Sequence, residues 1–241
     1  MERDVTKRKH APDAPARTPE VEDAERPSNA REVILREAAI LFSTKGYAES
    51  GLREIAEMAG IRSSTVYYYF ASKDRIYEEI IRLAIDATIE SVMAQLAALP
   101  RHATPRMRIE AAIAGHLLAL HANKPFTSTN AQSRMTLPEE VNAVIQPMRE
   151  RYSAFWRDLL DAAAAAGCLQ AGLEPRMLRP LILGTLNRTV GWFDSNTSPI
   201  EKLVRTTVIT FSGIWCQGTE GAPDNSCRAE KATKATKRRS A

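Results

Sequence analysis

The chain has 241 residues, of which 44% are hydrophobic and 26% charged, a composition that can build a substantial globular core. Its net charge of +4 permits an anionic partner without requiring one. No stretch approaches the roughly 20 apolar residues of a membrane span, and the N-terminus lacks the apolar core of a signal peptide. We therefore expect a cytoplasmic protein with no membrane partner.

The two ends of the chain differ from its body. Residues 1–28 are rich in proline, alanine and charge without any period, which predicts a disordered N-terminal arm. Residues 217–241 carry six basic against three acidic side chains and predict a disordered basic tail.

The body between these ends shows neither strand alternation nor glycine-rich hairpin signals, so it predicts an all-α fold. About nine helices are expected, over 29–45, 51–58, 62–70, 73–99, 104–122, 126–134, 138–166, 174–194 and 199–216. Gly46 is expected to end the first helix. Ser50 and Ser72 are expected to cap the second and the fourth. Pro147 falls inside a predicted helix, where it should produce a kink or a break.

The two short helices 51–58 and 62–70, joined by a tight turn at Gly60, form a helix-turn-helix. In that motif the second helix enters the major groove of DNA. Val66 and Phe70 share one side of this helix and are assigned to the core, which turns Tyr67 and Tyr68 outward. An exposed phenol can pack on a thymine methyl group or a sugar and still hydrogen bond to a phosphate. Two other readings remain: such helix pairs are common in all-α proteins, and surface tyrosines also anchor protein interfaces.

Residues 31–80 resemble the DNA-binding domain of the TetR (tetracycline-repressor-like) family. The segments AAILFSTKGY, LREIAEMAGI, STVYYYF and SKDRI carry the resemblance. It implies a DNA-contacting set made of residues that cap, open or face outward from these helices: Ser50, Arg62, Ser63, Ser64, Thr65, Tyr67, Tyr68 and Lys73.

The resemblance also implies a role for each of these residues. Ser50 contacts a phosphate while capping its helix, Tyr67 and Tyr68 contact backbone or bases, and Lys73 clamps a phosphate. The chain departs from the family pattern at two positions. Gly51 replaces a small hydroxylic residue, which should weaken the start of the second helix. Arg62 stands where serine or threonine is usual, and it either reads a guanine or lies along the DNA backbone.

The same resemblance implies a homodimer that binds a palindromic operator, with the last two helices of each protomer pairing into a four-helix bundle. Dimerisation also suits DNA reading, because two recognition helices about 34 Å apart reach successive turns of the major groove. Two apolar stripes fit this bundle. They are Leu178, Leu181, Ile182, Thr185, Leu186, Thr189 and Trp192, and then Leu203, Val204, Phe211, Ile214 and Trp215.

The middle helices are then expected to hold a small apolar effector, and residues 151–194 loosely resemble the branch that senses acyl-CoA thioesters or fatty acids. Arg188 lies in an apparently apolar helix and is expected to be at least half buried, facing either a carboxylate of this chain or an anionic ligand. The effector site is assigned to Tyr152, Phe155, Trp156, Arg188 and Trp192.

These assignments divide the chain into the arm (1–28), a helix-turn-helix domain (29–72), an effector-binding and dimerisation domain (73–216) and the tail (217–241). No metal constellation, nucleophile–base pair or phosphate loop occurs, so we expect no cofactor and no enzymatic activity. The function predicted is a ligand-released repressor. Two alternatives stay open: a regulator whose C-terminal domain only mediates protein–protein assembly, and a ligand-dependent activator.

Overall fold

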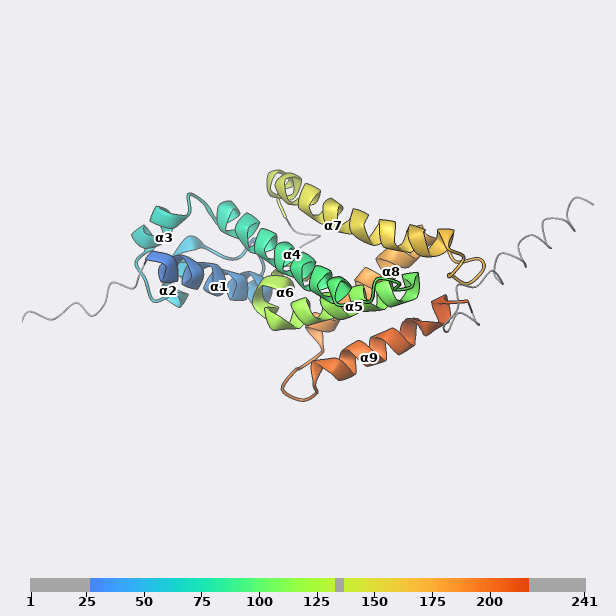
Figure 1. Cartoon of the computed structure of the whole chain (residues 1–241). Helices are drawn as coiled ribbons and strands as arrows, with labels where there is room; N and C mark the ends of the chain where they lie inside the picture. The colour runs from blue at the N-terminus through green and yellow to red at the C-terminus, as the bar shows by residue number, and fades with distance from the viewer. Residues whose placement is uncertain (1–26, 133–136, 217–241) are drawn as a thin grey trace, which may run out of the picture.

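A computed structural model describes residues 27–132 and 137–216, and these segments are helical almost throughout (Figure 1). The arm predicted over 1–28 lies outside the described residues as far as residue 26, and the tail predicted over 217–241 lies wholly outside them. The elements are α1 (Pro27–Lys45), α2 (Leu52–Met58), α3 (Ser63–Tyr69), α4 (Lys73–Ala97), α5 (Pro105–Ala122), α6 (Lys124–Gln132), α7 (Glu139–Ala165), α8 (Pro175–Arg188) and α9 (Ile200–Thr210).

The all-α prediction is confirmed, since the described residues contain nine α-helices and no strand beyond one isolated bridge between Leu169 and Trp215. The last two helices are shorter than predicted. Each ends in a 3₁₀ turn, Thr189–Gly191 after α8 and Phe211–Ile214 after α9. No helix in the described part of the chain is long and apolar enough to cross a membrane.

The predicted helix ends are right in two cases and wrong in one. Gly46 ends α1 with a φ of 92°, a left-handed conformation that glycine adopts without strain. Ser72 caps α4, its Oγ accepting from the backbone N–H of Arg75 at 3.3 Å. Ser50 does not cap α2, because Gly51 occupies the cap position and the Ser50 hydroxyl instead donates to the Gly46 carbonyl at 2.6 Å.

Pro147 does not break its helix, which is continuous over Glu139–Ala165. Proline removes one hydrogen bond to the carbonyl four residues earlier, here that of Ala143. Both Ala143 and Pro147 are exposed, so water can satisfy that carbonyl.

Two hydrophobic cores hold different parts of the molecule, and α4 belongs to both. The first joins α1, α2, α3 and the start of α4 to Phe126 of α6 and Val141 and Ile145 of α7. The second joins Val92 of α4 to α5, the end of α7, α8 and α9. The N-terminal head, residues 27–72, is therefore packed directly on the rest of the chain, and α4 leads from it into the body (Figure 1).

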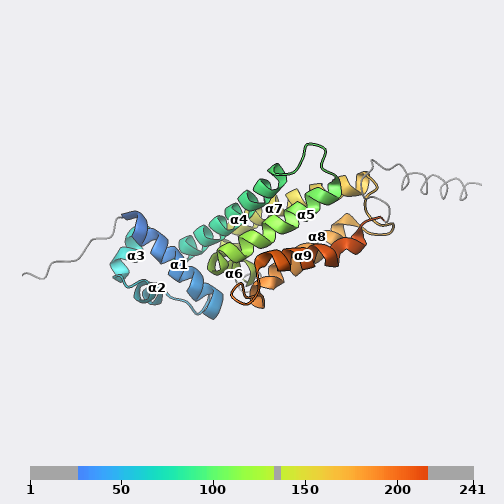
Figure 2. The same ribbon diagram turned by 60° about the horizontal axis from the view of Figure 1, so that its bottom comes forward.

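Helices α4 and α5 cross at close range in the body. A Cβ on Gly115 would lie 2.6 Å from the Cα of Val92, so only glycine fits there. The hydroxyl of Ser91 donates to the Gly115 carbonyl at 2.8 Å. On its other side α5 packs against α9 (Figure 2). The C-terminal part of α4 is thereby fixed against α5, while its first turn lies in the head.

Candidate nucleic-acid interface and effector site

The turn between α2 and α3 is held by its own backbone. The N–H of Ile61 donates to the Ala56 carbonyl at 3.0 Å, and Gly60 takes a φ of 66° that glycine tolerates. Val66 of α3 is completely buried in the first core. The two helices therefore form one rigid helix-turn-helix unit.

The outer face of α3 presents aromatic surface. Tyr67 is 58% exposed and Tyr68 82%, while Val66 and Phe70 are buried, as the angular spacing predicts. The Tyr68 ring contacts the half-buried ring of Tyr69 edge-on, with centroids 5.0 Å apart. Two large phenols are thus left facing solvent.

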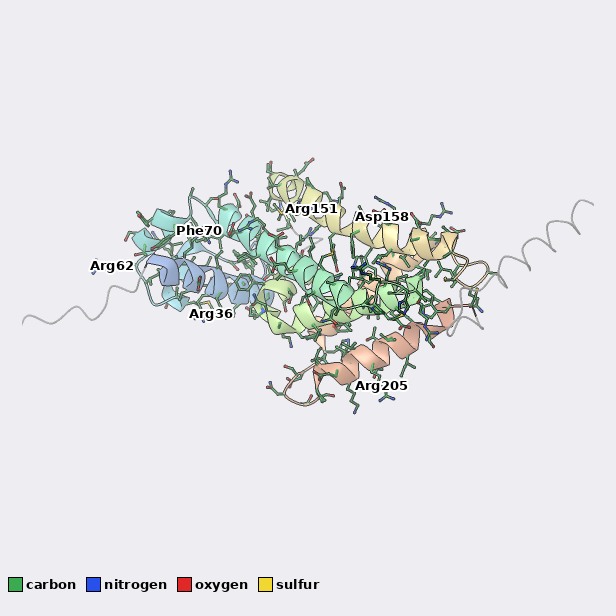
Figure 3. All side chains as sticks on the ribbon, in the orientation of Figure 1. Arg36, Arg62, Phe70, Arg151, Asp158 and Arg205 are labelled. Atoms are coloured by element: carbon green, nitrogen blue, oxygen red, sulfur yellow. The ribbon has the colours of Figure 1, made fainter. Side chains whose placement is uncertain are left out.

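The residues that open α3 lie beside these rings. Arg62 and Ser64 are exposed, while Ser63 and Thr65 are half buried. Figure 3 shows Arg62 projecting from the tip of the head. Sequence reasoning overlooked Arg53 of α2, which is also exposed and forms no ion pair with any described residue. The only sequence feature that could have indicated Arg53 is its position at the second residue of α2. Both guanidinium groups are available to an anionic partner.

Lys73 lies at the first residue of α4, as predicted, and its ammonium is bonded within the head. Its ammonium donates to the backbone carbonyls of Tyr47, Ala48 and Ser50, at 2.8, 3.4 and 3.0 Å, and lies 4.2 Å from the centre of the Tyr47 ring. All three of its protons are thus directed at the loop between α1 and α2. Phosphate contact by Lys73 stays a prediction, and its observed contacts hold this loop in place.

Tyr47 completes this cluster. Its hydroxyl donates to the carboxylate of Asp74, and burial together with that carboxylate raises the pKa of Tyr47 well above its usual range. The side chain of Ser50 is only 4% exposed and faces the same loop. Its predicted contact with DNA therefore depends on its backbone more than on its hydroxyl, and it too stays a prediction.

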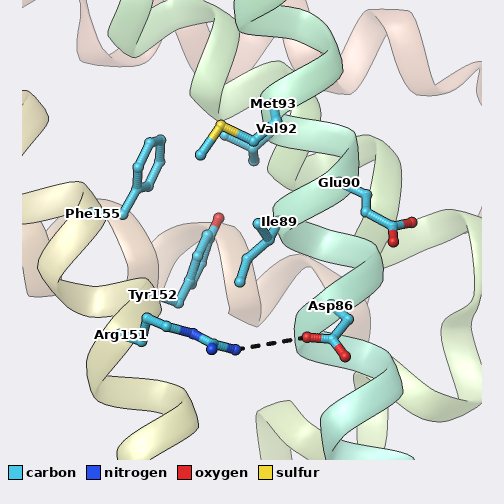
Figure 4. A pocket seen from close by; sticks show the side chains of 8 residues that line it. All are labelled: Asp86, Ile89, Glu90, Val92, Met93, Arg151, Tyr152 and Phe155. Atoms are coloured by element: carbon cyan, nitrogen blue, oxygen red, sulfur yellow. Dashed lines mark ion pairs between the residues drawn. The ribbon is translucent and has the colours of Figure 1, made fainter.

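A groove of about 410 Å³ separates α4 from α7 (Figure 4). Tyr152 and Phe155 line it from α7, their rings stacked with centroids 6.1 Å apart. Ile89, Val92 and Met93 line it from α4. At the rim Arg151 lies 3.9 Å from Asp86, with Glu90 nearby. We call this space the α4–α7 groove.

The other predicted effector residues lie elsewhere. Trp156 is completely buried in the second core, behind Phe155. Trp192 is 64% exposed. Arg188 is exposed as well, so the expectation that it is at least half buried is wrong. The buried stripe of α8 runs through Ile182 and Leu186, and Arg188 falls outside it, lining a separate cavity between α6, α7 and α8.

A chain of hydrogen bonds leads from the groove into the core. Nδ1 of the buried His116 lies 2.7 Å from the hydroxyl of Tyr152, and its Nε2 lies 3.2 Å from Oδ1 of Asn187. Because the amide oxygen of Asn187 only accepts, Nε2–H of His116 donates and Nδ1 accepts from Tyr152. Burial lowers the pKa of His116 to about 4, so the ring is neutral near pH 7.

Comparison with known families agrees with this arrangement. Residues 34–80 match the family of bacterial regulatory proteins called the tetR family. Residues 102–205 match the tetracyclin repressor-like C-terminal domain. The chain belongs to the TetR family.

Relatives of this TetR-family protein are transcriptional regulators rather than enzymes. The fatty acid metabolism regulator protein of Bacillus subtilis is 24% identical over 161 residues, 65% of this chain and 79% of that protein. The HTH-type transcriptional repressor KstR2 of Mycolicibacterium smegmatis is 24% identical over 186 residues, 76% of this chain and 84% of that protein.

Solved structures share the fold. The regulator PfmR from Thermus thermophilus has a TM-score of 0.64 and 24% identity, covering 76% of this chain and 96% of that chain. AibR, solved in complex with isovaleryl coenzyme A and operator DNA, has a TM-score of 0.67 and 20% identity, covering 77% of this chain and 99% of its own.

Proposed function

We propose that this TetR-family protein is a dimeric repressor that binds a palindromic operator through α3 and is released by a small, largely apolar effector in the α4–α7 groove. The observation that carries the proposal is that one helix joins both sites. α4 begins at Lys73 in the head and lines the groove with Ile89, Val92 and Met93. Because its partner would be chromosomal DNA, the protein would act in the cytoplasm.

DNA binding rests on the exposed face of α3. Tyr67 and Tyr68 offer apolar rings with hydroxyl tips, and Arg62 and Arg53 add cations on either side of the turn. Aromatic rings can contact base edges and sugars, and arginine can contact guanine or phosphate. We assign sequence reading to the start of α3 and backbone contacts to its flanks.

Dimerisation is supported by apolar side chains that the protomer leaves exposed. Met177 and Leu181 lie one turn apart on α8 and are 57% and 62% exposed, and Ile209 of α9 is 60% exposed. Trp192 follows α8 and is 64% exposed. Of the stripe predicted for the dimer, Leu178, Ile182 and Leu186 are instead buried within the protomer. The proposed dimer surface therefore runs through Met177, Leu181 and Trp192.

The effector is assigned by the groove's chemistry. Its walls are apolar and aromatic, and the cation at its rim is Arg151 rather than Arg188. A fatty acid or acyl-CoA would place its chain between Ile89 and Phe155 and its polar end outward near Arg151. The names of the Bacillus relative and of the AibR complex support this class.

Release would follow from movement of α4. An effector inserted beside Ile89 pushes on α4 about one turn before its crossing with Gly115 at Val92, so the part of the helix that leads to the head tilts about that point. The heads of the dimer would then no longer match successive major grooves. Coupling of about 1–3 kcal/mol is typical for such a shift.

The test is selection of bound operator DNA from the genome, followed by a release screen with fatty acids, acyl-CoA thioesters and apolar drugs. An effector of this kind must release the operator, and the operator must weaken effector binding by the same factor. Equal effector affinity with and without operator would contradict the mechanism. Absence of any selected palindrome would contradict the DNA-binding assignment itself.

A further inference from the structure

A second cleft opens on the neighbouring face of α7, between α6, α7 and α8. It consists of two adjoining cavities of about 850 and 650 Å³ whose linings share Ser153 and Arg179. A small cavity of about 50 Å³ adjoins them, lined by Asn130, Ser153 and Asn187 among others. Arg149, Ser153 and Arg157 are spaced four residues apart, so one face of α7 forms the wall. We call this space the α6–α8 cleft.

The α6–α8 cleft is strongly cationic. The residues lining its two large cavities include five arginines and one acid, namely Arg149, Arg151, Arg157, Arg179 and Arg188 against Glu150. Carboxylates partly offset two of these charges, since Arg151 lies 3.9 Å from Asp86 and Arg157 lies 4.0 Å from Asp158. Arg179 and Arg188 form no ion pair with any described residue. A positive excess therefore remains between α7 and α8.

The guanidinium groups on its walls are positioned rather than freely solvated. Arg149 is only 8% exposed, and its Nε and Nη2 both donate to the single oxygen Oδ1 of Asn130 at 3.2 Å. Arg179 is half buried and donates to the hydroxyl of Ser153. Arg179 is bonded here to a neutral hydroxyl and has no carboxylate partner among the described residues, so its charge is left for an anion that enters the cleft. Like charges gathered in one cleft also repel each other until an anion binds.

The shape and lining of the cleft indicate the ligand. Planar guanidinium forks match phosphate oxygens in a bidentate way. The volume exceeds that of a single inorganic ion, and the remaining lining is rich in neutral hydrogen-bonding groups: Asn130, Asn142, Gln146, Ser153 and Asn187. The α4–α7 groove, by contrast, is mainly apolar and has two acids at its rim. We propose that the α6–α8 cleft, which adjoins the α4–α7 groove at Arg151, is a site that binds an organic phosphate.

Such a phosphate has two possible sources. Arg151 lines both the groove and the 850 Å³ cavity, so the two spaces meet at this residue. A single ligand could place an apolar chain in the groove and its phosphates in the cleft. A separate nucleotide could occupy the cleft alone. Only the first source rests on the effector role proposed for the groove.

The decisive measurement is calorimetric titration of the full-length protein, without operator, using adenosine 3′,5′-bisphosphate and inorganic pyrophosphate as probes. We expect saturable binding of the bisphosphate that weakens with added salt. Arg179→Gln should weaken it at least tenfold. The matched control is Arg205→Gln, which removes an arginine on the outer side of α9 and should leave affinity unchanged (Figure 3). Ser153→Glu, which introduces a carboxylate beside Arg179, should abolish binding.

Failure would take a clear form. Absence of saturable binding at millimolar bisphosphate, or an equal loss in the Arg179 and Arg205 variants, would overturn the proposal.

Coenzyme A, octanoate and octanoyl-coenzyme A separate the two sources. A thioester that binds more tightly than either part alone identifies one ligand spanning both spaces. A thioester no tighter than coenzyme A identifies a separate phosphate ligand. Since the probes need neither operator nor an apolar chain, this result is independent of whether the groove binds an effector.

Discussion

The hydroxyl of Tyr152 lies 2.7 Å from Nδ1 of His116, so a side chain that lines the α4–α7 groove is bonded to a buried imidazole on α5. The other ring nitrogen reaches Asn187 on α8. Three helices thus meet at one neutral histidine. A ligand that moves Tyr152 would therefore also shift His116 and Asn187, and Asn187 lies on α8 beside the surface proposed for the dimer.

This buried histidine predicts a pH dependence of stability. The pKa of His116 falls from 6.5 to about 4 on folding, so the unfolded chain binds more protons between these values. The free energy of unfolding should therefore be unaffected by His116 above pH 6.5 and decline as the pH falls toward 4. The total loss is roughly 3 kcal/mol, at about 1.4 kcal/mol per pH unit.

Denaturant unfolding at several pH values, compared with His116→Gln, checks this expectation. The variant should lose part of the decline below pH 6.5. His121→Gln serves as the comparison. Burial, with Lys124 second, lowers the pKa of His121 in the same direction, so this variant should also lose part of the decline. A difference between wild type and the His116 variant that stays constant from pH 7 to 4 would contradict the assignment.

Tyr67→Ala should weaken operator binding by about 1–3 kcal/mol, because the exposed ring loses its contact with a base or an ordered phosphate. Affinity for random DNA should change less. Fluorescence anisotropy with operator and scrambled duplexes measures both. The control is Val144→Ala, which truncates an exposed apolar side chain on α7. Equal operator affinities for wild type and Tyr67→Ala would remove α3 from the proposed interface.

Lys73→Met should destabilise the head as well as weaken DNA binding. The ammonium satisfies carbonyls of the α1–α2 loop, and hydrogen bonds to charged groups are worth about 1.5–3 kcal/mol. Arg53→Met is the matched control, since that side chain is exposed and should affect only DNA affinity and its salt dependence. Unchanged thermal stability of the Lys73 variant, with a salt slope lowered by about one, would instead favour the simple phosphate clamp.

The sequence predicts the head well because its signals are local. The spacing of Val66 and Phe70 fixes which side of α3 is buried, and Gly60 marks the turn. The cap on α2 is misplaced by one residue, because Ser50 and Gly51 are both acceptable cap residues and only the loop geometry separates them. Ser50 turns instead to the carbonyl of Gly46.

The surroundings of the α4–α7 groove are predicted less well, because the residues that contact one another there are far apart in the sequence. His116 finds Tyr152 at a separation of 36 residues and Asn187 at 71, and no local pattern records either pairing. On α8, both the Leu178–Ile182 stripe and the Met177–Leu181 stripe are apolar. Tertiary packing decides that the first is core and the second is exposed, and that choice also turns Arg188 outward.

Leu181→Glu should dissociate the proposed dimer. A carboxylate on the exposed apolar stripe of α8 would have to be desolvated on association, and it would face its own copy if Leu181 lies near the two-fold axis. Sedimentation velocity should show at least a tenfold weaker association. Val144→Glu introduces the same charge at a 43% exposed position on α7 and should leave the dimer intact. Monomeric wild-type protein at micromolar concentration would contradict the dimer proposal.

Gly115→Ala tests the crossing of α4 and α5. The new methyl group would lie 2.6 Å from the Cα of Val92 and 2.8 Å from the Ser91 carbonyl oxygen, distances that backbone atoms relieve only by moving the helices apart. Overpacking of this kind costs about 1–3 kcal/mol, and separation of the helices would also lengthen the Ser91 hydrogen bond. Gly184→Ala is the control: no atom lies within 4 Å of a Cβ there, and alanine favours a helix interior by about 1 kcal/mol over glycine. Chemical denaturation should therefore show the Gly115 variant destabilised and the Gly184 variant unchanged or stabilised. If the Gly115 variant remains folded, its operator affinity should also fall. A displaced α4 would change the distance between the two heads of the dimer, which must match the operator. A Gly115 variant with wild-type stability would mean that α4 can shift freely at this crossing, and the proposed pivot would be lost.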